Sequence, residues 1–322
     1  MSETPLFQSQ RHELAAEGVA PPLPVGLGST PLTETARRSL QRFFDKLLAC
    51  EETVLAGEDA TGVHQMRVAT RRLRASLQVL EGVYDHKLIR RHRRGLRQIA
   101  QSLGAVRDGD VFLAHIALYR HSLPRRARNA LKPLVGAVAA ERSQARQLLL
   151  KELTGKEYPK FKQRFSAFLT TPGKGELPSP EAGVTQRVRD FAGSAIWRRY
   201  ELWRAYETVL PGGSDQSLHQ ARIAGKQMRY TIEFFADTLG PQVQQVLAPL
   251  IALQDGLGVL QDGVTARSHI AALGLANDPG AQSYLAARTA ECAELRVRVP
   301  CLWEQVASPT YQRRLFELIL GL

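Results

Sequence analysis

The sequence predicts an all-α protein built from two related helical bundles. Apolar residues recur at spacings of three and four along most of the chain, and no region alternates apolar and polar residues over a convincing strand length. Two short motifs each occur twice, at offsets of 155 and 154 residues, which indicates an internal duplication. The period is too long for a solenoid repeat and fits a helical bundle built twice.

The first motif predicts a helix with apolar and cationic residues on opposite faces. It reads His64-Gln-Met-Arg-Val-Ala-Thr-Arg-Arg-Leu-Arg74. Helical spacing places one set on the core side: Met66, Ala69, Leu73, Leu77 and Leu80. The same spacing places a second set on the other side: His64, Arg67, Arg71 and Arg74. No acid lies between Asp59 and Glu81 to offset these like charges, so the face predicts contact with an anion.

The second motif repeats this pattern in the second half of the chain. It reads His219-Gln-Ala-Arg-Ile-Ala-Gly-Lys-Gln-Met-Arg229. Its cationic face carries the matching residues: His219, Arg222, Lys226 and Arg229. Its apolar face is rebuilt as well: Ala221, Ala224, Met228, Ile232 and Phe235. Arg72 points about 100° away from the first cationic face and is matched by Gln227, so we expect it only to support the site.

A shorter echo follows each motif. Leu103-Gly-Ala-Val-Arg-Asp-Gly109 becomes Leu257-Gly-Val-Leu-Gln-Asp-Gly263. The acids that the two copies share are Asp108 and Asp262. They are predicted either to cap a helix N-terminus or to orient a motif arginine or histidine, and the sequence leaves both alternatives open. General acid or base catalysis by these acids is the less favoured interpretation.

The chain order follows from the apolar spacing and from Gly and Pro. Residues 1–28 are expected to form a flexible arm, 29–171 the first bundle, 172–183 a linker and 184–322 the second bundle. Helices of the first bundle are expected over 30–55, from a cap at Asp59 or Thr61 to 84, from 87, from 108, over 124–153 and over 157–169. Those of the second are expected over 184–209, from a cap at Ser214 or Asp215 to 239, and over 242–260, 262–274, 279–297 and 302–320.

Positive charge is concentrated in the first half. The chain carries a net charge of +12. Residues 60–130 hold 15 Lys and Arg against four acids, whereas the matching window 215–285 holds four bases and six acids. The helix that begins at residue 87 adds its own cations: Lys87, Arg90, Arg91, Arg94 and Arg97. A polyanionic partner is therefore expected, held mainly by the first half.

Several classes of protein are disfavoured. No run of about 18 apolar residues predicts a membrane span, and the first residues lack the pattern of a signal peptide. Three scattered cysteines predict free thiols in a cytoplasmic protein. Neither a zinc-binding spacing, nor a Walker loop, nor a G-x-S-x-G elbow is present. We therefore expect no metal, no cofactor and no catalytic residues.

The repeated H-x-x-R-x-x-x-[RK]-x-x-R motif, followed each time by L-G-x-x-x-D-G, resembles the CHAD domain (conserved histidine α-helical domain). The resemblance covers about residues 29–322. It implies two helical bundles whose motif helices face a central basic cavity or groove. It also implies binding of inorganic polyphosphate rather than catalysis, with roles in storage, granule targeting or scaffolding. The alternating glutamates of a CYTH domain are absent, so the CHAD domain is expected to stand alone.

The residue chemistry fits this ligand. Residues at i, i+3, i+7 and i+10 extend over about 15 Å of helix, so a linear polyanion along that face meets a cation at each turn. An arginine fork binds phosphate oxygens through two parallel hydrogen bonds, and a nearby anion favours the charged form of histidine. A nucleic-acid-binding protein is the first alternative, although the basic window has few aromatics for base stacking. A phosphohydrolase or phosphate-transfer enzyme is the second.

Overall fold

The computed structural model describes residues 27–57, 60–178, 186–210 and 212–322. Within these ranges the regular structure is α-helical or 3-10-helical, and β pairing is confined to isolated bridges, such as the one between Tyr84 and Glu176. The all-α prediction is therefore confirmed. The helices group into two compact units, each formed by more than one stretch of the chain.

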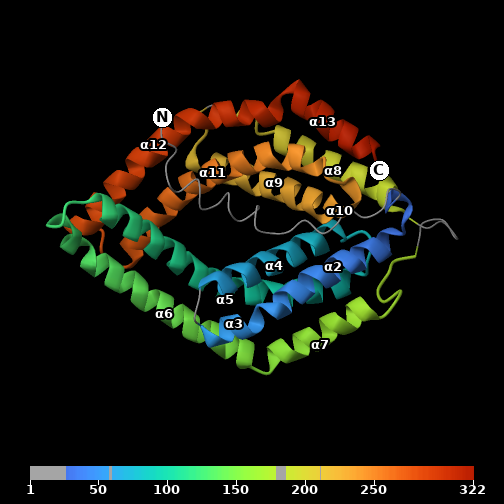
Figure 1. Cartoon of the computed structure of the whole chain (residues 1–322), viewed down its shortest axis with the longest axis horizontal. Helices are drawn as coiled ribbons and strands as arrows, with labels where there is room; N and C mark the ends of the chain where they lie inside the picture. Colours follow the sequence, from blue (N-terminus) through green and yellow to red (C-terminus); the bar gives the residue numbers. More distant parts are fainter. Residues whose placement is uncertain (1–26, 58–59, 179–185, 211) are drawn as a thin grey trace. The chain divides into compact units, whose positions relative to one another are not determined.

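The N-terminal unit consists of residues 31–186 together with residues 265–289. Its helices in chain order are α2 (Leu32–Ala49), α3 (Glu51–Ala56), α4 (Ala60–Val79), α5 (His86–Ser122), η2 (Ala127–Leu131), α6 (Lys132–Thr154) and α7 (Glu157–Thr170). Helix α4 contacts both α2 and α5, and α5 also runs alongside α6 (Figure 1). The first motif therefore lies on a helix flanked by two others.

An aromatic cluster fixes α7 against α2 and α5. The rings of Phe44 and Phe165 meet edge to face at 5.0 Å. His92 is stacked on Phe168 at 5.1 Å and is only 3% exposed. A Cβ added to Gly95 would lie 2.6 Å from the Phe161 ring, so glycine permits the close approach of α5 and α7 there.

The remaining core of the N-terminal unit draws on residues far apart in the sequence. Helices α11 (Val243–Ala272) and α12 (Pro279–Ala307) contribute residues 265–289 to it. Ile270 and Tyr284 from these helices are buried with Phe112, Ile116 and Leu134 from α5 and α6. The compact units thus differ from the predicted bundles chiefly in this stretch, which the sequence analysis assigned to the second bundle.

The C-terminal unit takes the described residues up to Thr30, together with 187–264 and 290–322. Its helices are η1 (Leu27–Ser29), α8 (Val188–Arg204), α9 (Asp215–Phe234), α10 (Ala236–Leu239), most of α11, the end of α12, and α13 (Pro309–Leu320). The indoles of Trp203 and Trp303 lie 4.6 Å apart. The Tyr311 hydroxyl donates to the carbonyl of Val246 at 3.0 Å. These contacts join α8, α11, α12 and α13 around one core.

Three helix ends predicted from glycine and proline residues are wrong, because the helices continue through all three positions. The residues at these positions serve the packing of neighbouring helices and do not form turns. Helix α5 runs unbroken through Asp108 and Gly109. A Cβ on Gly109 would lie 2.8 Å from the Cβ of Arg142, so this glycine admits α6. Helix α11 continues past 260–262, where Gly263 faces the Cys292 sulfur. Helix α12 continues through Pro300, and the nearby Val299 and Trp303 are buried in the core.

The helix starts are partly as expected. Ser214 caps α9, accepting a hydrogen bond from the Ser217 amide at 3.2 Å. Asp85 caps α5, accepting from the Leu88 amide at 2.8 Å, and the sequence analysis missed it. Thr61 lies inside α4, while Asp59 falls outside the described residues.

Helix α11 is long and apolar enough to cross a membrane by length and composition alone. Its 18-residue window has a mean hydropathy of 1.3, and half of that window is buried within the protein. Core helices of proteins that span no membrane show the same combination. The sequence prediction counted uninterrupted apolar runs and so did not single out this helix.

Candidate anion-binding site

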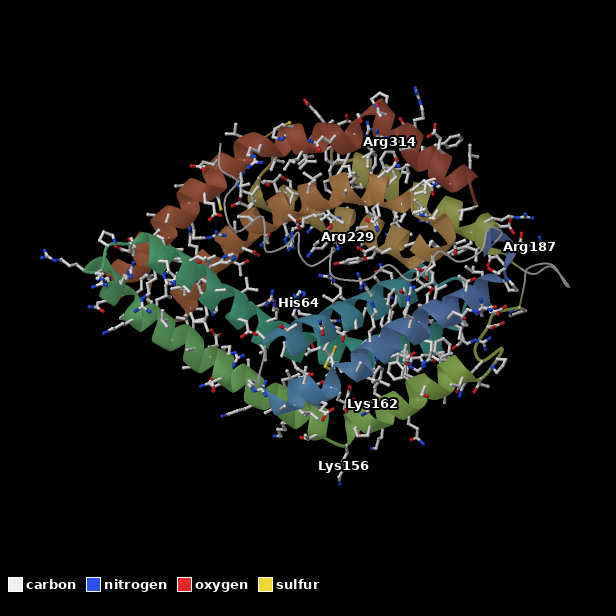
Figure 2. The ribbon with its side chains drawn as sticks, viewed as in Figure 1. His64, Lys156, Lys162, Arg187, Arg229 and Arg314 are labelled. Atoms are coloured by element: carbon white, nitrogen blue, oxygen red, sulfur yellow. The ribbon has the colours of Figure 1, made fainter. Side chains whose placement is uncertain are left out.

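The apolar side of α4 is buried as expected. Met66, Leu73 and Leu77 are fully buried, and Ala69 is 3% exposed. This burial fixes the rotation of α4, so the polar set points away from the core. Figure 2 labels the first member of this set, His64.

Helices α4 and α5 run antiparallel with their basic faces in register. A carboxylate oxygen of Asp108 lies 3.8 Å from the guanidinium of Arg67. Further along α4, Arg74 lies close enough to Arg93 to be affected by its charge. Just beyond α4, Glu81 forms an ion pair with Arg93. Residue numbers therefore rise along one helix as they fall along the other.

A basic pocket of about 340 Å³ lies where the two helices meet. Its charged lining consists of Arg74, Glu81, His86, Arg90, Arg93, Arg94 and Arg97, with Ile89 at its base. The Glu81–Arg93 pair offsets one of these arginines. A second contact joins Arg90 to a ring nitrogen of His86 at 2.8 Å. The pocket thus holds five arginines against a single carboxylate.

The surroundings of Arg74 in the pocket disfavour the charged form of its guanidinium. Partial burial lowers the pKa of Arg74, and the neighbouring charges of Arg93 and Arg97 lower it further. Cations held this close destabilise one another. A bound anion would reverse that repulsion and would accept hydrogen bonds from several guanidinium groups at once.

Four of the predicted cations line this pocket, and others do not. Those that do are Arg74, Arg90, Arg94 and Arg97. Lys87 and Arg91 are exposed but are not among its lining residues. The charge of Arg91 instead acts on His92, on another face of α5. His64, Arg67 and Arg71 lie further back along α4 and continue the row away from the pocket.

Sequence reasoning missed Arg93, His86 and Glu81. The signal was present for the first two, because positions 86, 90, 93 and 97 follow the helical spacing of three and four. No such signal exists for Glu81. It follows α4, and only the antiparallel packing brings it to Arg93.

Asp108 does not cap a helix, since it lies in the middle of α5. The other alternative, a partner for a motif arginine, agrees with its distance to Arg67. Gly104, four residues before Asp108, lies beside the same arginine. A Cβ on Gly104 would lie 3.9 Å from Nε of Arg67, so the glycine leaves room for this side chain.

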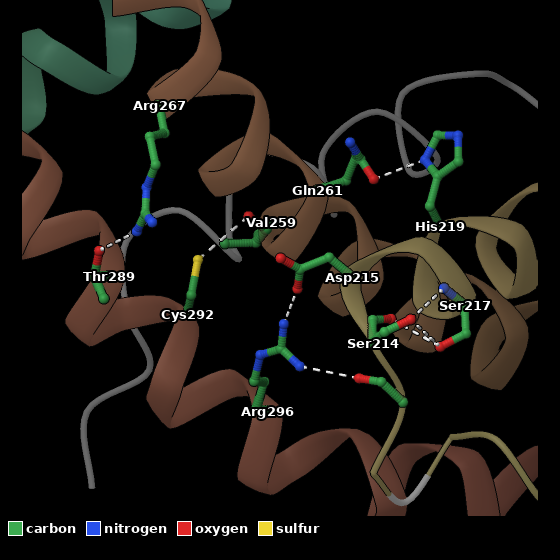
Figure 3. A network of polar contacts seen from close by, with 11 residues as sticks. Ser214, Asp215, Ser217, His219, Val259, Gln261, Arg267, Thr289, Cys292 and Arg296 are labelled. Carbon is green, nitrogen blue, oxygen red and sulfur yellow. Dashed lines mark hydrogen bonds and ion pairs between the residues drawn. The ribbon is translucent and has the colours of Figure 1, made fainter. Parts of the chain in front are cut away.

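The second motif helix, α9, shows the same arrangement against α11. A Cβ on Gly258 would lie 3.8 Å from Nε of Arg222. Asp262 also lies inside a helix, so it is not a cap either. One residue before it, Gln261 contacts Nδ1 of His219 at 2.7 Å (Figure 3). This contact orients the imidazole. The sequence analysis had offered that role to the neighbouring Asp262 and had not considered Gln261.

The two motifs differ at their last cation. Nε of Arg229 donates to Glu233 at 2.6 Å, and the two side chains are only 15% and 10% exposed. Burial by itself lowers the pKa of Arg229. The negative charge of Glu233 has the larger combined effect, so the pKa of the guanidinium is raised. In the first motif, the position that matches Glu233 is Gln78. Arg229 is therefore neutralised within its own helix, whereas Arg74 faces a pocket of like charge.

Arg72 has a structural partner on α2. Its guanidinium lies 5.9 Å from the centroid of the Phe43 ring, within the range of a cation–π contact. This agrees with its expected position off the cationic face.

The described residues contain no cluster of three or more His, Cys, Asp and Glu side chains arranged to hold a metal ion.

Comparison with known proteins assigns the chain to a family. The family model of the CHAD domain matches residues 38–271, well over half of the chain. The crystal structure of the CHAD domain from the plant Ricinus communis superposes with a TM-score of 0.65 at 23% identity, covering 94% of this chain and 98% of that one. PptA from Streptomyces chartreusis superposes with a TM-score of 0.66 at 17% identity, covering 85% and 100%. No curated protein matches the sequence. The chain belongs to the CHAD domain family.

Proposed function

We propose that this protein binds inorganic polyphosphate non-covalently, through the basic face that α4 and α5 share. The observation that carries the proposal is the pocket between these helices, where five arginines surround one carboxylate. Family membership supports the choice of polyphosphate among polyanions. The second motif contributes less, because Glu233 neutralises Arg229.

The charge distribution also favours a linear ligand. The row from His64 to Arg74 extends along α4 and opens into the pocket at one end. A chain of phosphates laid along it would meet a cation at every turn, and no single deep cavity is needed. Because each neutralised phosphate releases counterions, binding should weaken steeply with salt.

The direct test is competition at physiological salt. Purified protein bound to labelled long-chain polyphosphate is challenged with unlabelled polyphosphate, duplex DNA or tripolyphosphate. We expect polyphosphate to displace the label at concentrations at which DNA does not. Equal or better competition by DNA would instead make this a nucleic-acid-binding protein. Metal-dependent release of phosphate during the assay would identify an enzyme.

The site itself is tested by R74Q/R94Q/R97Q, which removes three exposed pocket charges. The matched control is R120Q/R125Q/R126Q, which removes the same charge from exposed positions elsewhere in the N-terminal unit. The pocket variant should reduce the salt slope of log K by roughly 2, at about 0.7 per lost phosphate contact. The control variant should bind like the parent protein. Equal losses in both would show that only net charge matters.

The cellular role we propose is attachment to cytoplasmic polyphosphate, including polyphosphate granules. The chain would act there as a binding or scaffolding module. Fluorescence microscopy of the tagged protein beside a polyphosphate stain, with R74Q/R94Q/R97Q as the comparison, tests this role. A diffuse signal for the parent protein in cells rich in granules would contradict it.

A further inference from the structure

A second basic pocket lies on α2, outside both motif helices. It has a volume of about 600 Å³ and reaches Leu169 of α7. Its cations all come from α2: Arg37, Arg38, Arg42 and Lys46. Two carboxylates share the pocket, and each has a partner on the same helix. Glu34 pairs with Arg38, and Asp45 accepts a hydrogen bond from Gln41 at 2.7 Å. Cations therefore outnumber carboxylates by two to one.

A pair of arginines connects this pocket to the motif helix. The guanidinium of Arg42 on α2 lies 5.1 Å from the centroid of the Phe43 ring. Arg72 of α4 lies 5.9 Å from the same centroid. The basic lining of the α2 pocket thus reaches the edge of α4 through one shared aromatic ring.

Helix α4 carries an arginine at each edge of its outward face. Arg72 and Arg74 are separated by about 200° around the helix, with Leu73 fully buried between them. Arg72 is directed to α2, and Arg74 lines the pocket shared with α5. A ligand crossing α4 from one pocket to the other would pass from one arginine to the next.

We infer that the α2 pocket is a second phosphate-binding subsite, so that one long polyphosphate chain crosses α5, α4 and α2 of the N-terminal unit. The inference rests on the proposed function and adds chain-length selectivity to it. Packed helices lie 8–10 Å apart, and both α4 and α2 separate the α4/α5 pocket from the α2 pocket, so a bridging chain must cover roughly 20 Å. Tripolyphosphate is too short to reach both pockets, whereas a long chain fills both.

Binding at both subsites raises affinity without any new kind of contact. Once one pocket holds part of the chain, the other pocket meets the remainder at a high effective concentration. Affinity should therefore rise with chain length until a chain can bridge the two pockets. A protein that bound polyphosphate only along the α4 row and in the α4/α5 pocket would show no further rise once a chain fills both of these.

The test is a chain-length series on the full chain, with tripolyphosphate at one end and long-chain polyphosphate at the other. The key variant is R38Q/R42Q/K46Q, which removes three cations of the α2 pocket. We expect its affinity for long chains to fall by about tenfold or more, and its affinity for tripolyphosphate to stay within about twofold. The same charge is removed elsewhere by R120Q/R125Q/R126Q, which should change neither.

A reciprocal variant tests the subsite without deleting a cation. E34Q/D45N removes the two carboxylates of the α2 pocket and should tighten binding of long chains only. At physiological salt, charges are screened over about 8 Å, so this change does not reach tripolyphosphate in the α4/α5 pocket. Circular dichroism and thermal unfolding verify that each variant is folded.

The outcomes separate this inference from the proposed function. If R74Q/R94Q/R97Q loses polyphosphate while R38Q/R42Q/K46Q binds all lengths like the parent, the function stands and the second subsite is wrong. If R38Q/R42Q/K46Q weakens tripolyphosphate as much as long chains, the α2 cations act through general charge, and the bridging arrangement is wrong. If the parent protein binds no polyphosphate of any length, the proposed function itself fails.

Discussion

Arg229 and Glu233 form an ion pair one helical turn apart on α9, and both side chains are largely buried. Arg74 occupies the matching position on α4, where Gln78 stands in place of the glutamate. A single carboxylate thus separates a neutralised cation from one available to a ligand.

Gln78→Glu should give the first motif the ion pair of the second. The new carboxylate would neutralise Arg74 across one turn, an interaction of about 0.5–1 kcal/mol, and polyphosphate affinity should fall about three- to fivefold. Isothermal titration at low salt measures the change. Gln144→Glu adds the same charge at an exposed position on α6 and should leave the affinity unchanged. An unaltered affinity in the Gln78 variant would mean that Arg74 contributes nothing to binding.

Glu233→Gln should destabilise the C-terminal unit. The charge of Arg229 would remain buried with its partner removed, at a cost of about 3 kcal/mol. Urea denaturation should show a lower midpoint with an unchanged m-value. Replacing the pair together, as R229M/E233L, should restore much of the loss, because apolar side chains of similar size need no charge compensation. A double variant no more stable than Glu233→Gln would contradict this account.

His92→Phe should remove part of the acid sensitivity of the N-terminal unit. Burial, together with the positive charges of Arg91, Arg164 and Lys174, lowers the pKa of His92 to about 4. In the unfolded chain His92 takes up a proton near pH 6.5, whereas in the folded protein it stays neutral down to about pH 4. The free energy of unfolding is therefore unaffected by this group above pH 6.5 and decreases as the pH falls towards 4. The contribution is roughly 3 kcal/mol. Phenylalanine suits the site, since Nε2 of His92 is buried without a hydrogen-bond partner among the described residues.

The measurement is stability by urea denaturation at pH values from 7.5 to about 4. The parent protein should lose stability over this range, and the His92→Phe variant should lose less. It should retain some loss, because burial, with Arg288 and Arg107, also lowers the pKa of His115 to about 4. Parallel profiles for parent and variant would show that His92 is not the group responsible.

Gly95→Ala should destabilise the protein, although alanine is the better helix former. The new methyl would lie 2.6 Å from the Phe161 ring, and forcing α5 and α7 apart costs about 2 kcal/mol. Gly136→Ala on α6 is the matched control, because a Cβ there meets nothing within 4 Å. That variant should gain about 0.5–1 kcal/mol from helix propensity. Thermal unfolding of the two variants should therefore shift in opposite directions.

Local patterns predicted most of the helices and the burial of both motif stripes, except for Ala224, which is only partly buried. Spacing of three and four is a property of the isolated helix, so residues such as Met66 and Met228 could be placed from the sequence. The helix breaks near Asp108 and Gly263 were misplaced for a physical reason. A glycine that admits a neighbouring helix and a glycine that ends a helix look alike until the neighbour is known.

The candidate site was predictable only in part, for the same reason. The arginines of α4 and α5 stand out in the sequence because they share helix faces. Glu81, Gln261 and Glu233 did not, since their importance depends on which cation they meet after packing. The α2 pocket also has no motif. It is formed by charged residues of α2 together with Leu169 of α7, which only the packing of the two helices brings together.

The stretch 265–289 has a consequence for how the chain is made. It supplies Ile270 and Tyr284 to a core whose other residues, such as Phe112 and Leu134, emerge from the ribosome well over a hundred residues earlier. Contacts so distant in sequence form late, because closing a long loop costs entropy before any burial repays it. During translation, that apolar surface stays open until α12 begins to appear. A fragment that ends at the linker would keep it open permanently and would be prone to aggregate.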